Sequence, residues 1–324
     1  MSYRPILVGV FLLAACFKSG SGGGSTPSNK TGPAGVDYSA TIADPIGFLP
    51  IDSEVVLSLD AEQLRRSAVW PMLETKLLAA AGNDLMMFKT VCGFDPVTSI
   101  SGITIGIKNL KQETPDGVLV VTGLDRTRLT ACMDKARQSG DKAVTVAADG
   151  TVTIAAEGAN DSPVVFGFVD ASTVVAMIGP ATSTPAFKAV LKAGSPLRTS
   201  AAFGELIGRV NLEAALWTVI NGNSSVFEQA ASLGMKPKAI VGSVLLANGL
   251  DATVRIRLAT PQEAQQVTTM AQGQLGMATN FFEKLEVTAD GSDVAVVGVM
   301  TDAQLQSMLS ILNGMLGGGG GGTP

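Results

Sequence analysis

Residues 240–258 read IVGSVLLANGLDATVRIRL, and this stretch decides the fold class. Two apolar runs flank Asn248-Gly249, a dipeptide that strongly favours a tight β-hairpin. In the second run apolar residues alternate with arginines, in the order Val254, Arg255, Ile256, Arg257 and Leu258. Such alternation is typical of a strand with one buried face and one solvated face. The stretch therefore predicts two antiparallel strands, Ile240–Ala247 and Leu250–Leu258.

Helix and hairpin signals follow this pair. Thr260 and Glu263 form a capping box around Pro261, so a helix is expected to begin there. A second hairpin is predicted at Asp290-Gly291, between apolar runs. Thr301 with Gln304 then caps a last helix, whose apolar residues fall on one stripe. The C-terminal half thus predicts strands and helices in regular alternation.

The N-terminal half shows the same order of signals. Asp60 and Gln63 open a helix expected over about 61–80, and Asp125 caps another to about 138. Strands are predicted at 55–59, 103–107, 118–121, 144–146, 152–154, 164–169 and 174–178, with a helix started by Thr184-Pro185. The closest local match between the halves sets residues 169–175 against 289–295.

We therefore predict an α+β fold, with antiparallel β-sheets and helices packed on one face. The pattern favours a tandem duplication of a unit with the order strand, helix, hairpin, helix, hairpin, helix. Its expected copies are residues 41–199 and 200–316. The alternative is that any chain of hairpins and helices looks self-similar at this level.

Composition excludes several classes of function. The 324 residues contain no histidine, which removes Ser-His-Asp and Cys-His nucleophile pairs and histidine-ligated zinc. Lys plus Arg number 23 against 28 Asp plus Glu, so no basic footprint for nucleic acid exists. We expect neither a metal nor a cofactor.

The N-terminus carries a targeting signal. An apolar run from Ile6 to Ala15 is too short to cross a bilayer and is typical of a signal peptide. Leu13-Ala14-Ala15-Cys16 resembles the lipobox of bacterial lipoproteins. The resemblance implies cleavage after residue 15 and lipidation of Cys16 on its sulfur, with palmitate expected among two or three acyl chains. The alternative is a plain secretory signal with an incidental cysteine.

Such an anchor implies a membrane contact through Cys16 and a place in the bacterial cell envelope. Phe17 follows the cysteine where that family places Asp in proteins kept at the inner membrane, so the resemblance implies the outer membrane. Residues 16–40 are rich in Gly, Ser and Pro and are expected to be a flexible tether. Residues 317–324 are expected to be a disordered glycine tail.

Cys92 and Cys132 remain as a pair in an oxidising compartment, and we expect a structural disulfide between them. Two free buried thiols and a redox-active pair are the alternatives. A redox-active pair would be expected to have the C-x-x-C spacing, which Cys92 and Cys132 lack.

No catalytic constellation emerges. Ser139 and Lys142 match the S-x-x-K spacing of acyl-transfer enzymes, but the partner motifs are missing and a chance match is favoured. Asp149, Asp290 and Asp293 could bind a hard cation, yet each lies at a glycine-containing turn, where Asp is favoured for backbone reasons. We therefore predict no catalytic residue and no metal ligand.

The body resembles a class of uncharacterised bacterial lipoproteins and secreted proteins. The resemblance lies in Leu49-Pro50-Ile51-Asp52 ahead of the first strand and Cys92-Gly93-Phe94-Asp95-Pro96 ahead of the first hairpin. We expect a non-catalytic envelope lipoprotein with a binding or structural role and an envelope protein as a possible partner. The alternatives are a carrier of an apolar ligand held in a concavity of the sheets and, second, a histidine-free hydrolase.

Overall fold

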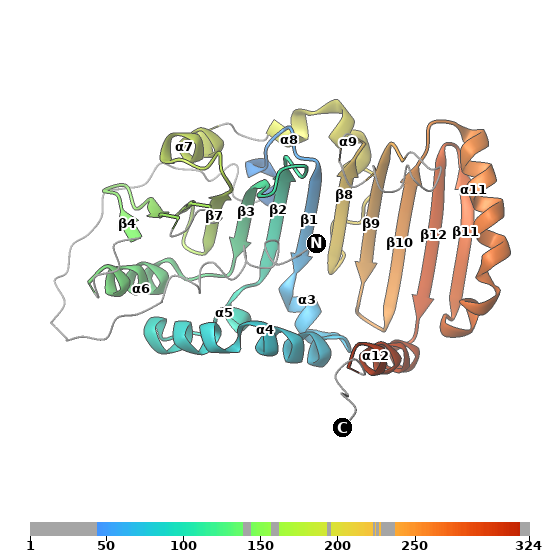
Figure 1. The fold of residues 1–324 in the computed structure, drawn as a ribbon, viewed down its shortest axis with the longest axis horizontal. Coiled ribbons are helices and arrows are strands. Elements are labelled where there is room, and N and C mark those ends of the chain that lie inside the picture. The colour runs from blue at the N-terminus through green and yellow to red at the C-terminus, as the bar shows by residue number, and fades with distance from the viewer. Residues whose placement is uncertain are drawn as a thin grey trace, which may run out of the picture. The chain divides into compact units, whose positions relative to one another are not determined.

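The computed structural model describes residues 44–138, 144–156, 162–192, 196–222, 224, 227 and 237–317 (Figure 1). The chain packs as two compact units, residues 1–56 with 78–204 and residues 57–77 with 205–324. The predicted signal peptide, the predicted tether and residues 318–324 of the predicted tail lie outside the described residues, as do residues 139–142. Segment 57–77, placed in the first predicted repeat, packs with the second unit.

The first unit is built on an antiparallel sheet with the strand order β2-β3-β7-β6-β5-β4. Its strands are β2 (Gly102–Lys108), β3 (Asp116–Thr122), β4 (Val144–Val146), β5 (Val152–Ile154), β6 (Val164–Phe168) and β7 (Thr173–Ile178). Its helices are η1 (Pro45–Phe48), α5 (Pro96–Ser99), α6 (Arg126–Gln138), α7 (Thr184–Lys192) and α8 (Pro196–Thr199). Three elements cross the boundary between the units, β1 (Val55–Asp60), α4 (Trp70–Cys92) and α9 (Ala201–Ile207).

In the first unit both faces of the sheet are covered. A Cβ at Gly106 would lie 2.7 Å from Ser53 Oγ, so the segment after η1 closes over that face of β2. The Phe187 ring of α7 covers the same face at Gly167 of β6. The opposite face carries Phe168, whose ring lies 6.0 Å from the Arg126 guanidinium of α6. The helices therefore pack on two faces here, where one was predicted, and this explains why six of the seven residues of β3 are buried.

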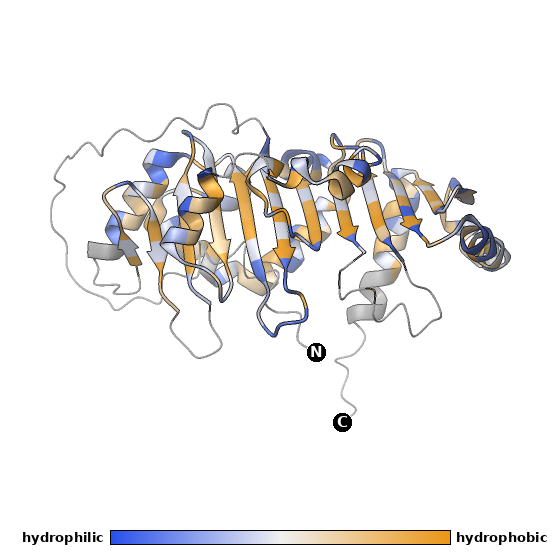
Figure 2. Cartoon of the chain, turned by 90° about the horizontal axis from the view of Figure 1, so that it is seen from above, coloured by the Kyte–Doolittle hydropathy of each residue, from blue (hydrophilic) through white to orange (hydrophobic). Residues whose placement is uncertain are grey.

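The second unit is built on an antiparallel sheet with the order β11-β12-β10-β9-β8. Its strands are β8 (Leu216–Asn221), β9 (Ala239–Leu245), β10 (Leu250–Arg257), β11 (Lys284–Asp290) and β12 (Asp293–Met300). Its helices are α3 (Ala61–Arg66), α11 (Pro261–Gln274), η2 (Leu275–Met277), η3 (Thr279–Phe281) and α12 (Asp302–Gly317). As Figure 2 shows, the strands of both units are coloured mainly as hydrophobic.

One face of the second sheet carries the core of this unit. Val267 and Ala271 of α11 pack against Val287 and Val294, and Leu305 of α12 packs with Met300. The register places these strand residues on a single face, which we call the helix-covered face. The residues that alternate with these along each strand point to the other face, which we call the arginine face because it carries Arg255 and Arg257.

The antiparallel α+β class is confirmed, and the two units share a strand order. β2, β3, β7 and β6 correspond in sequence order and in sheet position to β9, β10, β12 and β11. The matched stretches 169–175 and 289–295 both contain the turn between the last two of these strands. The last helices differ, because α7 packs on the face that corresponds to the arginine face whereas α12 packs on the helix-covered one. Tandem duplication stays a prediction.

The first predicted helix is two helices. Asp60 caps α3 as expected, since its Oδ1 accepts a hydrogen bond from Gln63 N at 2.9 Å. The helix ends at Arg66, where Ser67 Oγ donates to Leu64 O at 2.6 Å, and α4 begins at Trp70. Pro71 explains the break, because a proline lacks the N–H that a continuing helix needs and disfavours helical backbone in the residue before it.

The hairpin at Asn248-Gly249 is present, but its loop is longer than predicted. Leu245 pairs with Asp251, which places Asn248 at the tip. Gly249 has a φ of 101°, whereas Asn248 is not among the residues with positive φ. A two-residue type I′ turn needs positive φ at both central positions, so the turn is of another kind. A Cβ at Gly249 would lie 2.1 Å from Met300 O, which makes glycine obligatory there.

Candidate functional site

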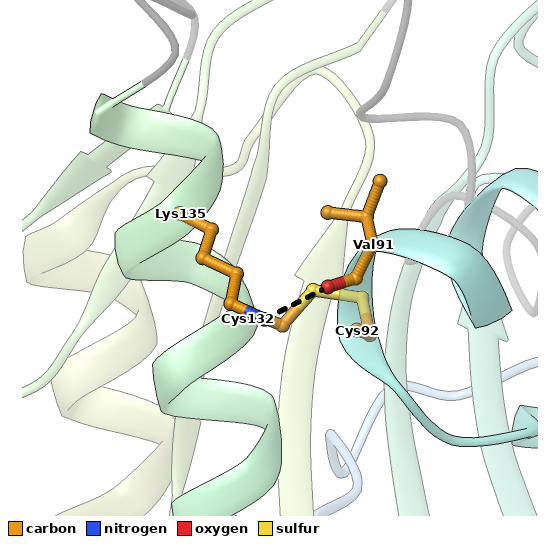
Figure 3. The surroundings of a disulfide bond; sticks show 4 residues. All are labelled: Val91, Cys92, Cys132 and Lys135. Carbon is orange, nitrogen blue, oxygen red and sulfur yellow. Dashed lines mark hydrogen bonds between the residues drawn. A yellow bond between two sulfur atoms is a disulfide. The ribbon is translucent and has the colours of Figure 1, made fainter. Parts of the chain in front are cut away.

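The predicted disulfide is present. Cys92 at the end of α4 is bonded to Cys132 of α6, and their Cα atoms lie 4.7 Å apart (Figure 3). Both residues are buried, and beside them Lys135 Nζ donates a hydrogen bond to Val91 O at 3.2 Å. The bond thus fixes α4 against α6. Burial of both cysteines favours the structural role over the redox-active pair.

Of the three predicted turn aspartates, Asp149 bonds to its own turn and also to Lys188 of α7, whose Nζ lies 2.7 Å from Asp149 Oδ2. Its Oδ1 accepts a hydrogen bond from Thr151 N at 3.1 Å. Hydrogen bonds from Lys188 and from Thr151 lower the Asp149 pKa to about 2. Within the described residues no group of three or more acidic or cysteine side chains is arranged to hold a metal ion.

Asp290 and Asp293 bind arginines, so the expectation of a backbone role is wrong for them. Asp293 Oδ1 accepts a hydrogen bond from Arg257 Nε at 2.8 Å, and Arg209 Nη1 bonds to Asp293 Oδ2. Arg257 Nη1 also reaches Glu205 Oε1 at 2.7 Å. We call this set, completed by the pair Arg255 and Asp290, the arginine network.

The sheet register assembles the network. Arg255 and Arg257 stand two residues apart on β10 and therefore share a face. Asp293, the first residue of β12, lies directly opposite Arg257. Glu205 and Arg209 come from the end of α9 and the segment after it. Three parts of the second unit thus converge on the arginine face.

The network differs in depth from one end to the other. The Asp293 side chain is 3% exposed and that of Arg257 is 21% exposed, whereas the Asp290 side chain is 66% exposed. Burial would raise the pKa of Asp293, but the hydrogen bond from Arg257 and the charges of the three arginines outweigh it, and the pKa is lowered. The hydrogen bond to Asp293 likewise raises the pKa of Arg257. The deep end is therefore a fixed ion cluster at neutral pH.

The shallow end opens onto a pocket of about 510 Å³. It is open to solvent and is lined by Gly208, Arg209, Val210, Asn211, Arg255 and Asp290. Arg255 Nη1 donates to Asp290 Oδ2 at 2.8 Å across the wall. The lining offers guanidinium donors, an amide and a carboxylate, which suits a polar ligand. It is not the apolar cavity that the carrier interpretation expects.

Sequence reasoning missed this site. The alternation in β10 identified Arg255 and Arg257 as residues of a solvated face, yet their side chains are 30% and 21% exposed. Their partners lie 35 and 36 residues away along the chain. Only the pairing of β10 with β12 brings them together, and no local pattern encodes that pairing.

No protein-family model matches the chain, and no curated protein matches it in sequence. Two crystal forms of TP0453, a treponemal envelope lipoprotein, are similar in structure. Form IV has a TM-score of 0.53 at 11% identity, covering 82% of this chain and 96% of TP0453. Form III has a TM-score of 0.52 at 10% identity, covering 83% and 98%. At this identity the likeness shows the fold.

Among the described residues, no helix is both long enough and apolar enough to cross a membrane.

Proposed function

We propose that this chain is a bacterial envelope lipoprotein, tethered through acylated Cys16, whose folded body has a non-catalytic binding role. The observation that carries the proposal is the lipobox Leu13-Ala14-Ala15-Cys16 ahead of a body whose fold is similar to that of an envelope lipoprotein. Neither feature suffices alone. The lipobox supports only the processing and acylation of the N-terminus, and the similarity in fold concerns only the folded body.

The composition supports a non-catalytic role. A chain without histidine lacks the usual proton shuttle at neutral pH. The charged groups that line the pocket described above all have ion-pair partners, and its one carboxylate, Asp290, is largely exposed. General acid or base catalysis uses groups whose pKa is brought near neutrality, commonly by burial. This pocket therefore favours binding over catalysis.

The disulfide supports an oxidising compartment. Cys92 and Cys132 are bonded in the folded body, and such bonds persist mainly outside the cytosol. The proposed location beyond the inner membrane provides that environment. A peptide of residues 16–40 would then separate the acylated end from the body, with a typical reach of roughly 25–30 Å for about 25 flexible residues.

The anchor is tested by expressing the full chain and its Cys16→Ser variant in a bacterium with a lipoprotein pathway. Wild-type protein is expected in the detergent-soluble membrane fraction, and the variant in the soluble periplasmic fraction. Ser19→Ala is the matched control and is expected to stay with the membrane. Equal release of wild type and Cys16→Ser would contradict the anchor.

The membrane of residence is tested separately. Phe17→Asp places an acidic residue directly after the acylated cysteine, which the lipoprotein resemblance links to retention at the inner membrane. Density-gradient separation is expected to show wild type in the outer membrane and the variant in the inner one. Identical distributions would remove the outer-membrane assignment and leave the anchor intact.

A further inference from the structure

We infer that the pocket beside Arg255 and Asp290 binds a small zwitterion, a free amino acid or short peptide. The carboxylate of the ligand would meet Arg255 and its ammonium group would meet Asp290. The inference rests on the arginine network and on the pocket. It is independent of Cys16, so loss of the anchor would leave it standing.

The fold itself does not require charges at these positions. The pairing of β3 with β7 sets Val120 opposite Val175, as β10 and β12 set Arg255 opposite Ala295. Val120 is thus the counterpart of Arg255 in the first unit, and it is 1% exposed in a closed apolar layer. The second unit has an arginine where the same strand arrangement accepts valine. On the arginine face the side chain at this position is 30% exposed, because α12 packs on the helix-covered face instead, so the guanidinium is accessible to a solute.

The two ends of the network have different capacities for a ligand. Asp293 is buried between two arginines, and Arg257 holds Asp293 and Glu205 at once. Among the described residues, Asp290 is the only one with a side-chain hydrogen bond to the Arg255 guanidinium. A guanidinium has five donors in a planar fork, so Arg255 can donate hydrogen bonds to a further carboxylate. Only the shallow end is free to exchange partners.

Charge balance selects the class of ligand. Arg209 is neutralised within the deep cluster, and Arg255 with Asp290 forms a neutral pair at the pocket wall. A simple anion bound to the remaining donors of Arg255 would leave the site net negative beside Asp290. A zwitterion satisfies both members of the pair and leaves the site neutral. The exposed Asp290 side chain can turn toward an ammonium group without exposing a buried surface.

The size of the pocket agrees with this class. A volume of about 510 Å³ lies within the range of about 300–1,000 Å³ typical of small-molecule sites. A single ion would leave most of that volume to water. A short peptide would fill it, and Asn211 and the backbone at Gly208–Val210 could meet its amide groups.

Calorimetric titration of the full chain with trialanine tests the inference, with N-acetyl-trialanine and trialanine amide as matched probes. We expect trialanine to bind and each blocked probe to bind at least about tenfold more weakly, because each leaves one charged group of the pair unmatched. Equal binding of the three probes, or no heat from trialanine at about 10 mM, would overturn the inference. Preferential binding of inorganic phosphate would also overturn it, in favour of an anion site.

Two variants assign the contacts. Asp290→Asn is expected to abolish the discrimination against N-acetyl-trialanine, and Arg255→Met to abolish the discrimination against the amide. Arg66→Met, at a side chain 78% exposed, is the control and should retain both. Asp290 is exposed, so Asp290→Asn is expected to fold. If Arg255→Met fails to fold, the binding of the three probes to Asp290→Asn still tests the proposed contacts. Unchanged discrimination in Asp290→Asn would refute the assigned contact.

Discussion

Replacement of Asp293 by alanine is expected to destabilise the second unit strongly. The Asp293 side chain is 3% exposed and is held by Arg257 and Arg209. Removing one partner of a buried ion pair typically costs about 3–5 kcal/mol. Arg257 would keep its bond to Glu205 Oε1 at 2.7 Å, so part of its charge stays matched. We therefore expect the lower end of that range, about 3 kcal/mol.

Glu205→Ala provides the matched control, because Glu205 binds the same arginine from an exposed position. Its side chain is 58% exposed, and such a pair contributes about 0–1 kcal/mol. The ratio of the two effects tests whether burial decides the contribution of each pair. If only packing mattered at this site, the loss of stability would not depend on how deeply the ion pair is buried.

Urea unfolding followed by tryptophan fluorescence measures both effects. The chain has two tryptophans, Trp70 and Trp217, and both belong to the second unit, so the signal reports on that unit. With a urea dependence of about 1–3 kcal/mol/M, a loss of 3 kcal/mol lowers the midpoint by about 1–3 M. Equal midpoint shifts for Asp293→Ala and Glu205→Ala, both corresponding to less than about 1 kcal/mol, would show that burial does not strengthen the Asp293 ion pairs.

Three further predictions concern pH, the disulfide and the hairpin. The folded-state pKa of Asp293 lies below its unfolded value of about 3.9. Its contribution to stability is therefore present above about pH 4 and is lost as the pH falls through the folded pKa. Acid titration should then unfold the second unit more steeply in wild type than in Asp293→Asn. Cys132→Ser should destabilise the first unit by about 4 kcal/mol, from the loop of 40 residues that the bond closes, and circular dichroism in urea should show no further loss on adding a reductant. Gly249→Ala should destabilise the β9–β10 hairpin by about 2 kcal/mol or more, because alanine at a φ of 101° is strained and its Cβ would meet Met300 O. Hydrogen exchange of the β9 and β10 amides should accelerate, whereas an unchanged rate would show that the turn adapts.

Local signals in the sequence predicted local structure well. Thr301 and Gln304 form the expected capping box, with Gln304 N donating to Thr301 Oγ1 at 3.3 Å and Thr301 N donating to Gln304 Oε1 at 3.0 Å. Thr260 caps α11, with Glu263 N donating to Thr260 Oγ1 at 3.2 Å and Ala259 N donating to Glu263 Oε2 at 3.1 Å. The alternation in β10 correctly separated the two faces of that strand, although the arginine face is less exposed than predicted. These features depend on residues three or four apart, or two apart, and such neighbours are visible in one sequence.

Features that depend on distant residues could not be predicted. The strand order that sets β7 between β3 and β6 follows from packing, and no turn signal encodes it. The burial of Asp293 follows from its place opposite Arg257, so a turn-forming residue type became part of an ion cluster. The second covered face of the first unit arises because η1 and α7 fold back over strands whose uniformly apolar sequence fits either arrangement.

Intact mass spectrometry of the mature protein, purified from membranes with its native N-terminus, tests the central proposal most directly. We expect that the mature chain begins at Cys16 and carries the added mass of two or three acyl chains, with Cys92 and Cys132 oxidised. A mature chain that retains residues 1–15, or one that begins at Cys16 or beyond without acyl mass, would contradict it.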